Sequence, residues 1–233
     1  MVTLGIDSTA KSASAAVVRG GVLLSEHFLN VGLTHSVTLL KLCEQAVESA
    51  GLTFGDLDCV AVNAGPGSFT GVRIGVALAK GLAFARDLPC VPVRTTACIA
   101  RPIQAPGGVV AAAMDARCGQ VYTALFETVD GESRRLTPDE AIPIEALGEK
   151  LKAYPYAIVA GDGAALVVET LADAHDRLIL APESVRHQRA GATALIGERD
   201  FAEKAVSAEA LVPFYIRPPQ AQRMLQKKPK TIS

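Results

Sequence analysis

One order of apolar segments occurs twice in these 233 residues, and this repetition constrains the fold more than any other feature. In each copy, two strand patterns flank a short polar turn, and helical and strand patterns then alternate. The first copy has strands at 2–7, 12–19, 22–28, 57–64 and 89–93, with helices over 34–49 and from about 68. The second has strands at 109–115, 120–127, 156–161 and 178–181, with helices over 144–153, 164–174 and 190–205. The repetition predicts an α/β fold with two related lobes.

This order matches a known ground plan. A duplicated β-β-β-α-β-α unit, with mixed sheets flanked by helices, is typical of the superfamily that contains actin, Hsp70 and the sugar kinases. Residues 101–108 contain two prolines and two glycines and form the expected linker between the lobes. The sequence therefore predicts an N-terminal lobe over 1–103 and a C-terminal lobe over 104–233 that ends in a basic tail at 223–230.

Composition limits the location and the partners of the chain. Its formal net charge of −1 supplies no broad positive field, so contact with nucleic acid would be local or provided by a partner. The apolar run at 72–85 contains Arg73 and Lys80 and is too short to span a bilayer, so we expect no membrane contact. The first residues form a strand pattern instead of a signal peptide, and the five scattered cysteines suit buried thiols in a reducing compartment. We expect a cytoplasmic protein.

A glycine-rich loop, Gly65 to Gly71, joins a predicted strand to a predicted helix. Such a loop can cradle a phosphate at the positive end of the helix, or it can let another element approach closely. It can also be no more than a tight turn. Its glycines do not follow the dinucleotide-binding spacing, and the chain contains no Walker motif.

Strand-end aspartates are the other candidates for chemistry. Asp7 and Asp115 each end a predicted strand, where a carboxylate can hold a metal-bound water or bond the backbone of its own turn. A histidine-pair metal site needs two ligands one helical turn apart, and the four histidines are spaced too far apart for this. The sequence predicts no metal site and no catalytic residue.

Two helices carry candidate docking surfaces. On the helix near 34–50, apolar residues cover at least half of the circumference, including Val37, Leu40, Cys43 and Val47. On the helix after the glycine-rich loop, a strip of small residues recurs every fourth position, at Gly71, Gly75 and Ala79. Such a strip allows close approach of another helix, although it can equally pack on its own sheet.

Motifs along nearly the whole chain resemble one family. They are GIDST at 5–9, THS at 34–36, GPGSFTGVRIG at 65–75, MDAR at 114–117, AGDG at 160–163 and VPFYIR at 212–217. Together, and in this order, they resemble the bacterial TsaB (YeaZ-like) family of the tRNA threonylcarbamoyladenosine machinery. The stretch at 65–75 is the most specific of them.

The resemblance implies an accessory subunit that is inactive alone. It would bind and activate a TsaD-like paralogue, which transfers threonylcarbamoyl to the tRNA adenosine beside the anticodon. The resemblance implies docking through the two helices described above and tRNA contact only through the complex. The apolar surface of the helix near 34–50 predicts in addition a homodimer when the partner is absent. The resemblance leaves open a TsaE-like ATPase and an ATP or ADP molecule in the assembled complex, and contact of the basic tail with tRNA.

The alternative is an ATP-dependent kinase or ATPase of the same superfamily. In that case Asp7 would lie near the metal, and Gly65 and Gly67 would lie near the nucleotide. The turns after the two aspartates argue against this activity because they contain few glycines to expose backbone donors to phosphate.

Overall fold

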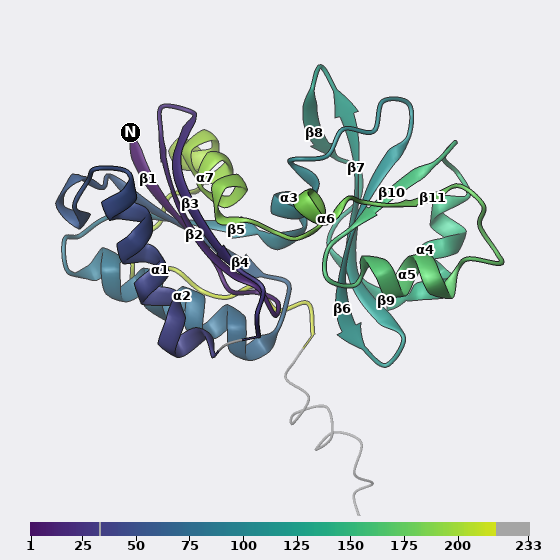
Figure 1. The fold of residues 1–233 in the computed structure, drawn as a ribbon, viewed down its shortest axis with the longest axis horizontal. Helices are drawn as coiled ribbons and strands as arrows, with labels where there is room; N and C mark the ends of the chain where they lie inside the picture. Colours follow the sequence, from purple (N-terminus) through teal and green to yellow (C-terminus); the bar gives the residue numbers. More distant parts are fainter. Residues whose placement is uncertain (33, 218–233) are drawn as a thin grey trace, which may run out of the picture.

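The computed structural model describes residues 1–32 and 34–217, so the basic tail lies outside the described residues. Figure 1 shows two lobes side by side, each built on a sheet with helices packed against it. The two sheets have the same topology, and the predicted fold class is therefore confirmed. None of the helices in the described part of the chain combines the length and apolar character that crossing a membrane requires.

The first sheet has the strand order β3-β2-β1-β4-β5. Its strands are β1 (Val2–Asp7), β2 (Ala13–Arg19), β3 (Val22–Leu29), β4 (Cys59–Gly65) and β5 (Cys90–Arg94). Strands β1, β4 and β5 run parallel, whereas β2 and β3 form an antiparallel hairpin on β1. Both β1 and β4 are buried along their whole length, which explains why they appear in the sequence as continuous apolar runs.

Helices cover both faces of this sheet. Helices α1 (His35–Ser49) and α2 (Phe69–Phe84) pack on one face, where they meet side chains such as Leu4, Val60 and Val62. Helix α7 (Ala190–Lys204) covers the opposite face and packs on Ala61 and its neighbours. Alternate residues of β4 thus serve two separate cores, as the two-residue period of a strand requires.

The second sheet repeats the first, with the order β11-β10-β6-β7-β8. Its strands are β6 (Val109–Arg117), β7 (Gln120–Val129), β8 (Glu132–Arg135), β10 (Ala157–Ala160) and β11 (Leu178–Leu180), and β9 (Glu140–Pro143) also pairs with β7. Helices α4 (Ile144–Leu151) and α5 (Ala164–Thr170) cover one face. The other face packs on α3 (Thr95–Ala100) and on Val185 of α6 (Glu183–Arg186).

The division at residue 104 does not describe the whole chain. Helix α7 and the residues after it return to the N-terminal lobe, where the backbone of Val206 pairs with Cys90 of β5. The predicted C-terminal lobe over 104–233 is therefore wrong for residues 190–214, which complete the other lobe. A boundary placed at a linker cannot anticipate this return, because the linker marks only the first crossing between lobes.

Candidate functional site

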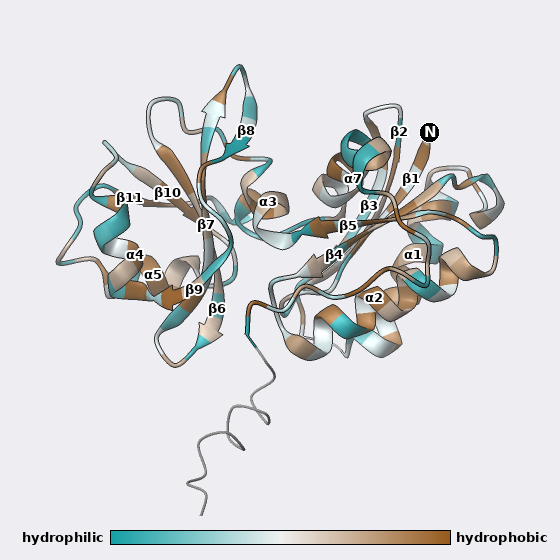
Figure 2. Cartoon of the chain, turned by 180° about the vertical axis from the view of Figure 1, so that it is seen from behind, coloured by the Kyte–Doolittle hydropathy of each residue, from teal (hydrophilic) through white to brown (hydrophobic). Residues whose placement is uncertain are grey.

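Helices α1 and α2 contact each other and form one outer face of the N-terminal lobe (Figure 1). Large apolar side chains on this face remain exposed: Val37 by 64%, Leu40 by 43% and Phe84 by 72%. The α2 ribbon in Figure 2 is mostly brown to white, as expected of a helix with few polar residues. We call the exposed side of these two helices the α1–α2 face; its exposed apolar and small residues are Val37, Leu40, Ala77, Gly81 and Phe84.

Several residues predicted for docking lie elsewhere. Cys43 and Val47 are buried between α1 and the sheet, and Gly71, Gly75 and Ala79 face the same core. A Cβ atom on Gly71 would meet the backbone oxygen of Ser8, and one on Gly75 would lie 2.6 Å from Ser8 Oγ.

The strip of small residues therefore lets α2 approach the end of β1. This is the alternative in which the strip packs on its own sheet and not on a partner. Expecting Gly71, Gly75 and Ala79 to contact a partner was wrong because a four-residue repeat identifies one helix face without showing which way it points. The small residues that do point outward are Ala77 and Gly81, and a Cβ on Gly81 would meet no atom within 4 Å.

The glycine-rich loop also serves close approach within the chain. Gly65 has φ +119° and lies against the backbone of Phe214, and Gly67 lies against the backbone of Thr9. The N–H of Ser68 donates to Thr9 O at 2.7 Å, and Ser68 Oγ accepts from the N–H of Gly71 at the start of α2. The N–H groups of Ser68 and Gly71 are thus occupied within the chain. Through Thr9 the loop contacts the β1–β2 turn, and through Phe214 it contacts the C-terminal segment.

Between the lobes lies a cleft of about 530 Å³, which we call the interlobe cleft. Four segments from both halves of the chain line it: residues 9–11, 66–70, 114–117 and 214–217. Of the residues predicted to lie near a nucleotide, Gly67 lines the cleft, whereas Gly65 and Asp7 do not.

Asp7 is fully buried and does not line this cleft. Its Oδ1 accepts hydrogen bonds from Thr9 Oγ1 at 2.7 Å and from Asn63 Nδ2 at 2.8 Å, while Oδ2 has no partner among the described residues. Burial raises the pKa of Asp7 to about 6, against the lowering effect of these hydrogen bonds. The carboxylate thus anchors the β1–β2 turn and is closed off from the cleft.

The second strand-end carboxylate also closes its own turn. Asp115 Oδ1 accepts from the N–H of Arg117 at 2.7 Å, and Oδ2 pairs with the guanidinium of the same residue at 3.1 Å. Residues Arg117, Cys118 and Gly119 all have positive φ, so the turn is left-handed throughout. Cys118 is exposed on this turn, whereas the other four cysteines are buried, so the expectation of five buried thiols was wrong at one position.

The segment 213–217 joins the two lobes and was not identified from the residues alone. The N–H of Phe214 donates to Ala64 O at 2.6 Å, and the Tyr215 ring lies 5.1 Å from that of Phe69. Arg217 reaches the C-terminal lobe, where its guanidinium donates to Ala141 O at 2.9 Å and to Gln120. Its one signal in the sequence was the apolar and aromatic motif VPFYIR at 212–217.

The histidines do not assemble a metal centre. His35 bonds the backbone oxygen of Ala10 at 2.8 Å, and His187 pairs with Glu183 at 2.9 Å. Within residues 1–32 and 34–217, no three side chains of the metal-binding types converge.

The chain is similar to known proteins of one family. The family model TsaD, tRNA N6-adenosine threonylcarbamoyltransferase, matches residues 30–221. The Bacillus subtilis protein named tRNA threonylcarbamoyladenosine biosynthesis protein TsaB is 28% identical over 95% of this chain and 96% of its own length.

Solved structures show the same relationship. YeaZ from Pseudomonas aeruginosa has a TM-score of 0.76 at 28% identity, covering 92% of this chain and 99% of that one. A ROK hexokinase from Thermus thermophilus, with a TM-score of 0.51 at 14% identity over 84% of this chain and 98% of that one, shares the fold alone. The chain belongs to the TsaD (tRNA N6-adenosine threonylcarbamoyltransferase) family and is a TsaB/YeaZ-like protein.

Proposed function

We propose that this chain is a non-catalytic subunit that binds a TsaD-like transferase and raises its activity in the threonylcarbamoyladenosine modification of tRNA. Membership of the TsaD family and likeness to proteins named TsaB support the pathway. A TsaE-like ATPase and a bound ATP or ADP would join only in the assembled complex, and tRNA contact would come through that complex. The role implies a cytoplasmic location.

The observation that carries the proposal is the α1–α2 face. Val37, Leu40 and Phe84 expose large apolar side chains that the chain does not cover itself. Burying them against a partner would remove apolar surface from water, which favours association. Ala77 and Gly81 are exposed and small, so a helix of the partner could approach α2 closely at these positions.

Activation would follow from differential binding. If this face contacts one conformation of the transferase better than another, it raises the population of that conformation. No chemistry on this chain is then required. The burial of Asp7 and the engagement of Asp115 within its own turn support a subunit without a catalytic role.

One observation favours the ATP-dependent alternative. Lys11, Arg117 and Arg217 line the interlobe cleft together with Asp115 and Asp162, so three cations face two carboxylates and an ATP phosphate would find a net positive charge. ATP hydrolysis by the isolated chain, abolished by Asp7→Asn, would favour this alternative over the accessory role.

The proposal is tested with the Leu40→Glu variant and the TsaD-like protein of the same organism. Leu40 is exposed by 43% on α1, so the variant should fold normally, whereas burial of the new carboxylate at the interface would be costly. We expect loss of co-elution with the partner and loss of its stimulated tRNA modification.

Leu166→Glu is the matched control. Leu166 is exposed by 40% on α5 of the other lobe, so the same substitution occurs at similar exposure away from the α1–α2 face. The control should bind like the wild type. Normal binding by Leu40→Glu would contradict the assignment of this face.

A further inference from the structure

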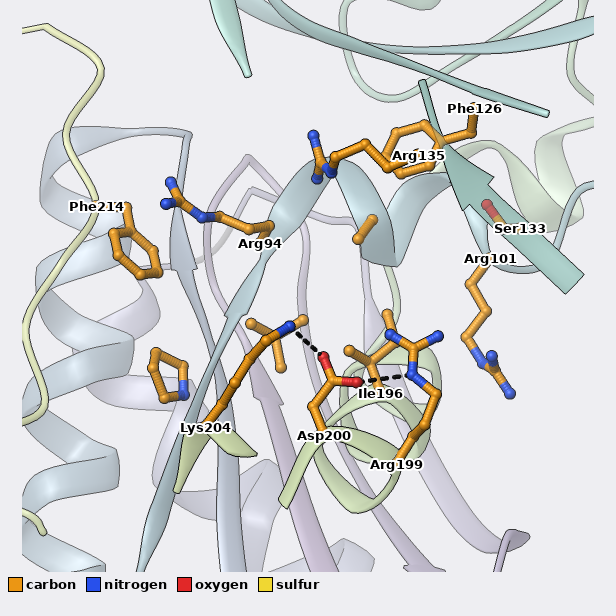
Figure 3. Close-up of a pocket in the computed structure, with 13 residues that line it drawn as sticks. Arg94, Arg101, Phe126, Ser133, Arg135, Ile196, Arg199, Asp200, Lys204 and Phe214 are labelled. Atoms are coloured by element: carbon orange, nitrogen blue, oxygen red, sulfur yellow. Dashed lines mark hydrogen bonds and ion pairs between the residues drawn. The ribbon is translucent and has the colours of Figure 1, made fainter. Parts of the chain in front are cut away.

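A second cavity lies between the lobes, separate from the interlobe cleft, and the proposed function does not use it. It has a volume of about 580 Å³. Side chains of α7 and β5 from the N-terminal lobe and of α3, β7 and β8 line it, together with Phe214. Figure 3 shows Arg94 and Arg135 along one side, Arg199 and Lys204 along the opposite side, and Arg101 near one end. We call it the cationic pocket.

Two groups of side chains on opposite walls carry excess positive charge. On one wall, Asp139 pairs with Arg135 at 2.9 Å and with Arg94 at 3.6 Å. On the other wall, Asp200 pairs with Arg199 and Lys204, each at 2.7 Å (Figure 3). Two cations share one carboxylate in each group, so each group has a net charge of +1.

Aromatic rings hold two of the guanidinium groups in position. The Arg94 guanidinium lies 3.5 Å from the centre of the Phe214 ring, and that of Arg135 lies 4.6 Å from the centre of the Phe126 ring. Such contacts restrict the long side chains before any ligand binds, which lowers the entropic cost of binding. Both arginines remain partly exposed to solvent, so a ligand can reach them.

The floor of the pocket increases the effect of these charges. Val93, Ala97 and Ile196 are apolar, and Asp200 is the one carboxylate among the lining residues that the structure describes. A concave surface with apolar walls and a net positive charge concentrates the electrostatic field and attracts anions. Arginine forks also match the oxygen geometry of phosphate.

We propose that the cationic pocket binds a free ligand with two linked phosphate groups, one at each positively charged wall. Because Arg199 and Lys204 belong to one lobe and Arg135 to the other, the ligand would link the lobes and reduce their relative motion. The proposal does not depend on the proposed partner, and the isolated full-length chain can be tested.

The probe is inorganic pyrophosphate, titrated into the chain by isothermal calorimetry, with orthophosphate for comparison. We expect pyrophosphate to bind more tightly than orthophosphate. Arg94→Gln/Arg199→Gln should weaken pyrophosphate binding by more than about tenfold, because each wall loses one charge-assisted donor. Arg134→Gln is the matched control, since Arg134 neighbours Arg135 on β8 but lies outside the pocket and is 66% exposed; its binding should be unchanged.

A variant of opposite sign separates ligand binding from a structural role. Asp200→Asn removes a negative charge from the pocket and frees Arg199 and Lys204, so it should tighten pyrophosphate binding. Loss of affinity in Asp200→Asn would contradict the proposal.

Three other results would also overturn it. The first is that the wild-type chain does not bind pyrophosphate at millimolar concentration. The second is that pyrophosphate binding is lost in Lys11→Gln/Arg117→Gln, which alters the interlobe cleft, and not in the variant of the cationic pocket. The third is that Arg94 and Arg199 bind an RNA oligonucleotide but not pyrophosphate.

Discussion

Asp7 is a carboxylate held in a dry environment, and its ionisation opposes the native state. Burial raises the pKa of Asp7 to about 6, so the native protein binds this proton more tightly than the unfolded chain does. Between about pH 4 and pH 6 the native state therefore holds more protons, and the free energy of unfolding falls as the pH rises through this window. The favourable contribution is complete below the unfolded pKa and is lost as the pH passes the folded one.

Asp7→Asn tests this at constant shape. The amide oxygen can still accept from Thr9 and Asn63, and the side chain no longer ionises. Compared with the wild type, the variant should gain up to about 3 kcal/mol in its free energy of unfolding between pH 4 and pH 7. Urea unfolding of both proteins at several pH values gives the difference in their free energies of unfolding at each pH. Any pH-independent cost of the new amide shifts this difference equally at every pH, so it does not affect the change between pH 4 and pH 7. A difference that is constant with pH would mean that Asp7 is not held as described.

At the scale of single residues, the sequence predicted positions better than environments. Asp7 at the end of a strand followed from the apolar run before it. Its burial did not, because the residues that cover it, Asn63 and Thr9 among them, come from two separate segments. Cys118 shows the converse: as one of five scattered cysteines it was expected to be a buried thiol, and the left-handed turn exposes it.

On α2, two glycines six residues apart have opposite surroundings, which allows a matched test within one element. A Cβ on Gly75 would lie 2.6 Å from Ser8 Oγ, and Ser8 could move only by weakening its hydrogen bond to Gly71 O. A Cβ on Gly81 would enter open space. Gly75→Ala should therefore destabilise the protein by about 1–3 kcal/mol, whereas Gly81→Ala should stabilise it by about 0.5–1 kcal/mol.

Thermal or urea unfolding of the two variants measures this contrast. Equal effects would show that the two faces of α2 are equally open, contrary to the packing. A bulkier substitution extends the test to function. Gly81→Leu should fold normally but bind the transferase more weakly, because the new side chain fills space on the α1–α2 face.

For whole elements, the prediction succeeded where the apolar period was strong. The predicted helix at 34–49 corresponds to α1 at His35–Ser49, and the helix expected from about 68 begins at Phe69 after the Ser68 cap. The third strand of the C-terminal lobe was missed because β8 and β9 have four residues each and β8 is polar. Such segments are too short to show a two-residue period.

For the whole molecule, the duplicated topology followed from the sequence, whereas the return of α7 to the first lobe did not. A periodic pattern predicts that a helix exists and has an apolar side. The sheet that covers this side is decided by long-range packing, here by the fit of Gly197 against Ala61 and of Gly5 against Ala194. The cationic pocket depends on this return, since α7 provides one of its two charged walls.

We expect the α1–α2 face to determine the association state of the free protein. Without a transferase, the exposed Val37, Leu40 and Phe84 would remain in water, and a second copy can cover them through a two-fold contact of the same face. We expect light scattering at micromolar concentration to give twice the chain mass of 24.3 kDa. Leu40→Glu should be monomeric, and Leu166→Glu should remain dimeric.

If the homodimer and the complex use the same face, they compete. Adding the transferase should then convert the homodimer into the complex, and the Leu40→Glu variant should lose both forms of association together. A dimer that persists in Leu40→Glu would place self-association elsewhere, for example at the exposed edge strand β3, where Val22 and Leu23 face solvent. A wild-type chain that is monomeric yet binds the transferase through Leu40 would instead show that the face is specific for its partner, and that apolar exposure alone does not drive self-association.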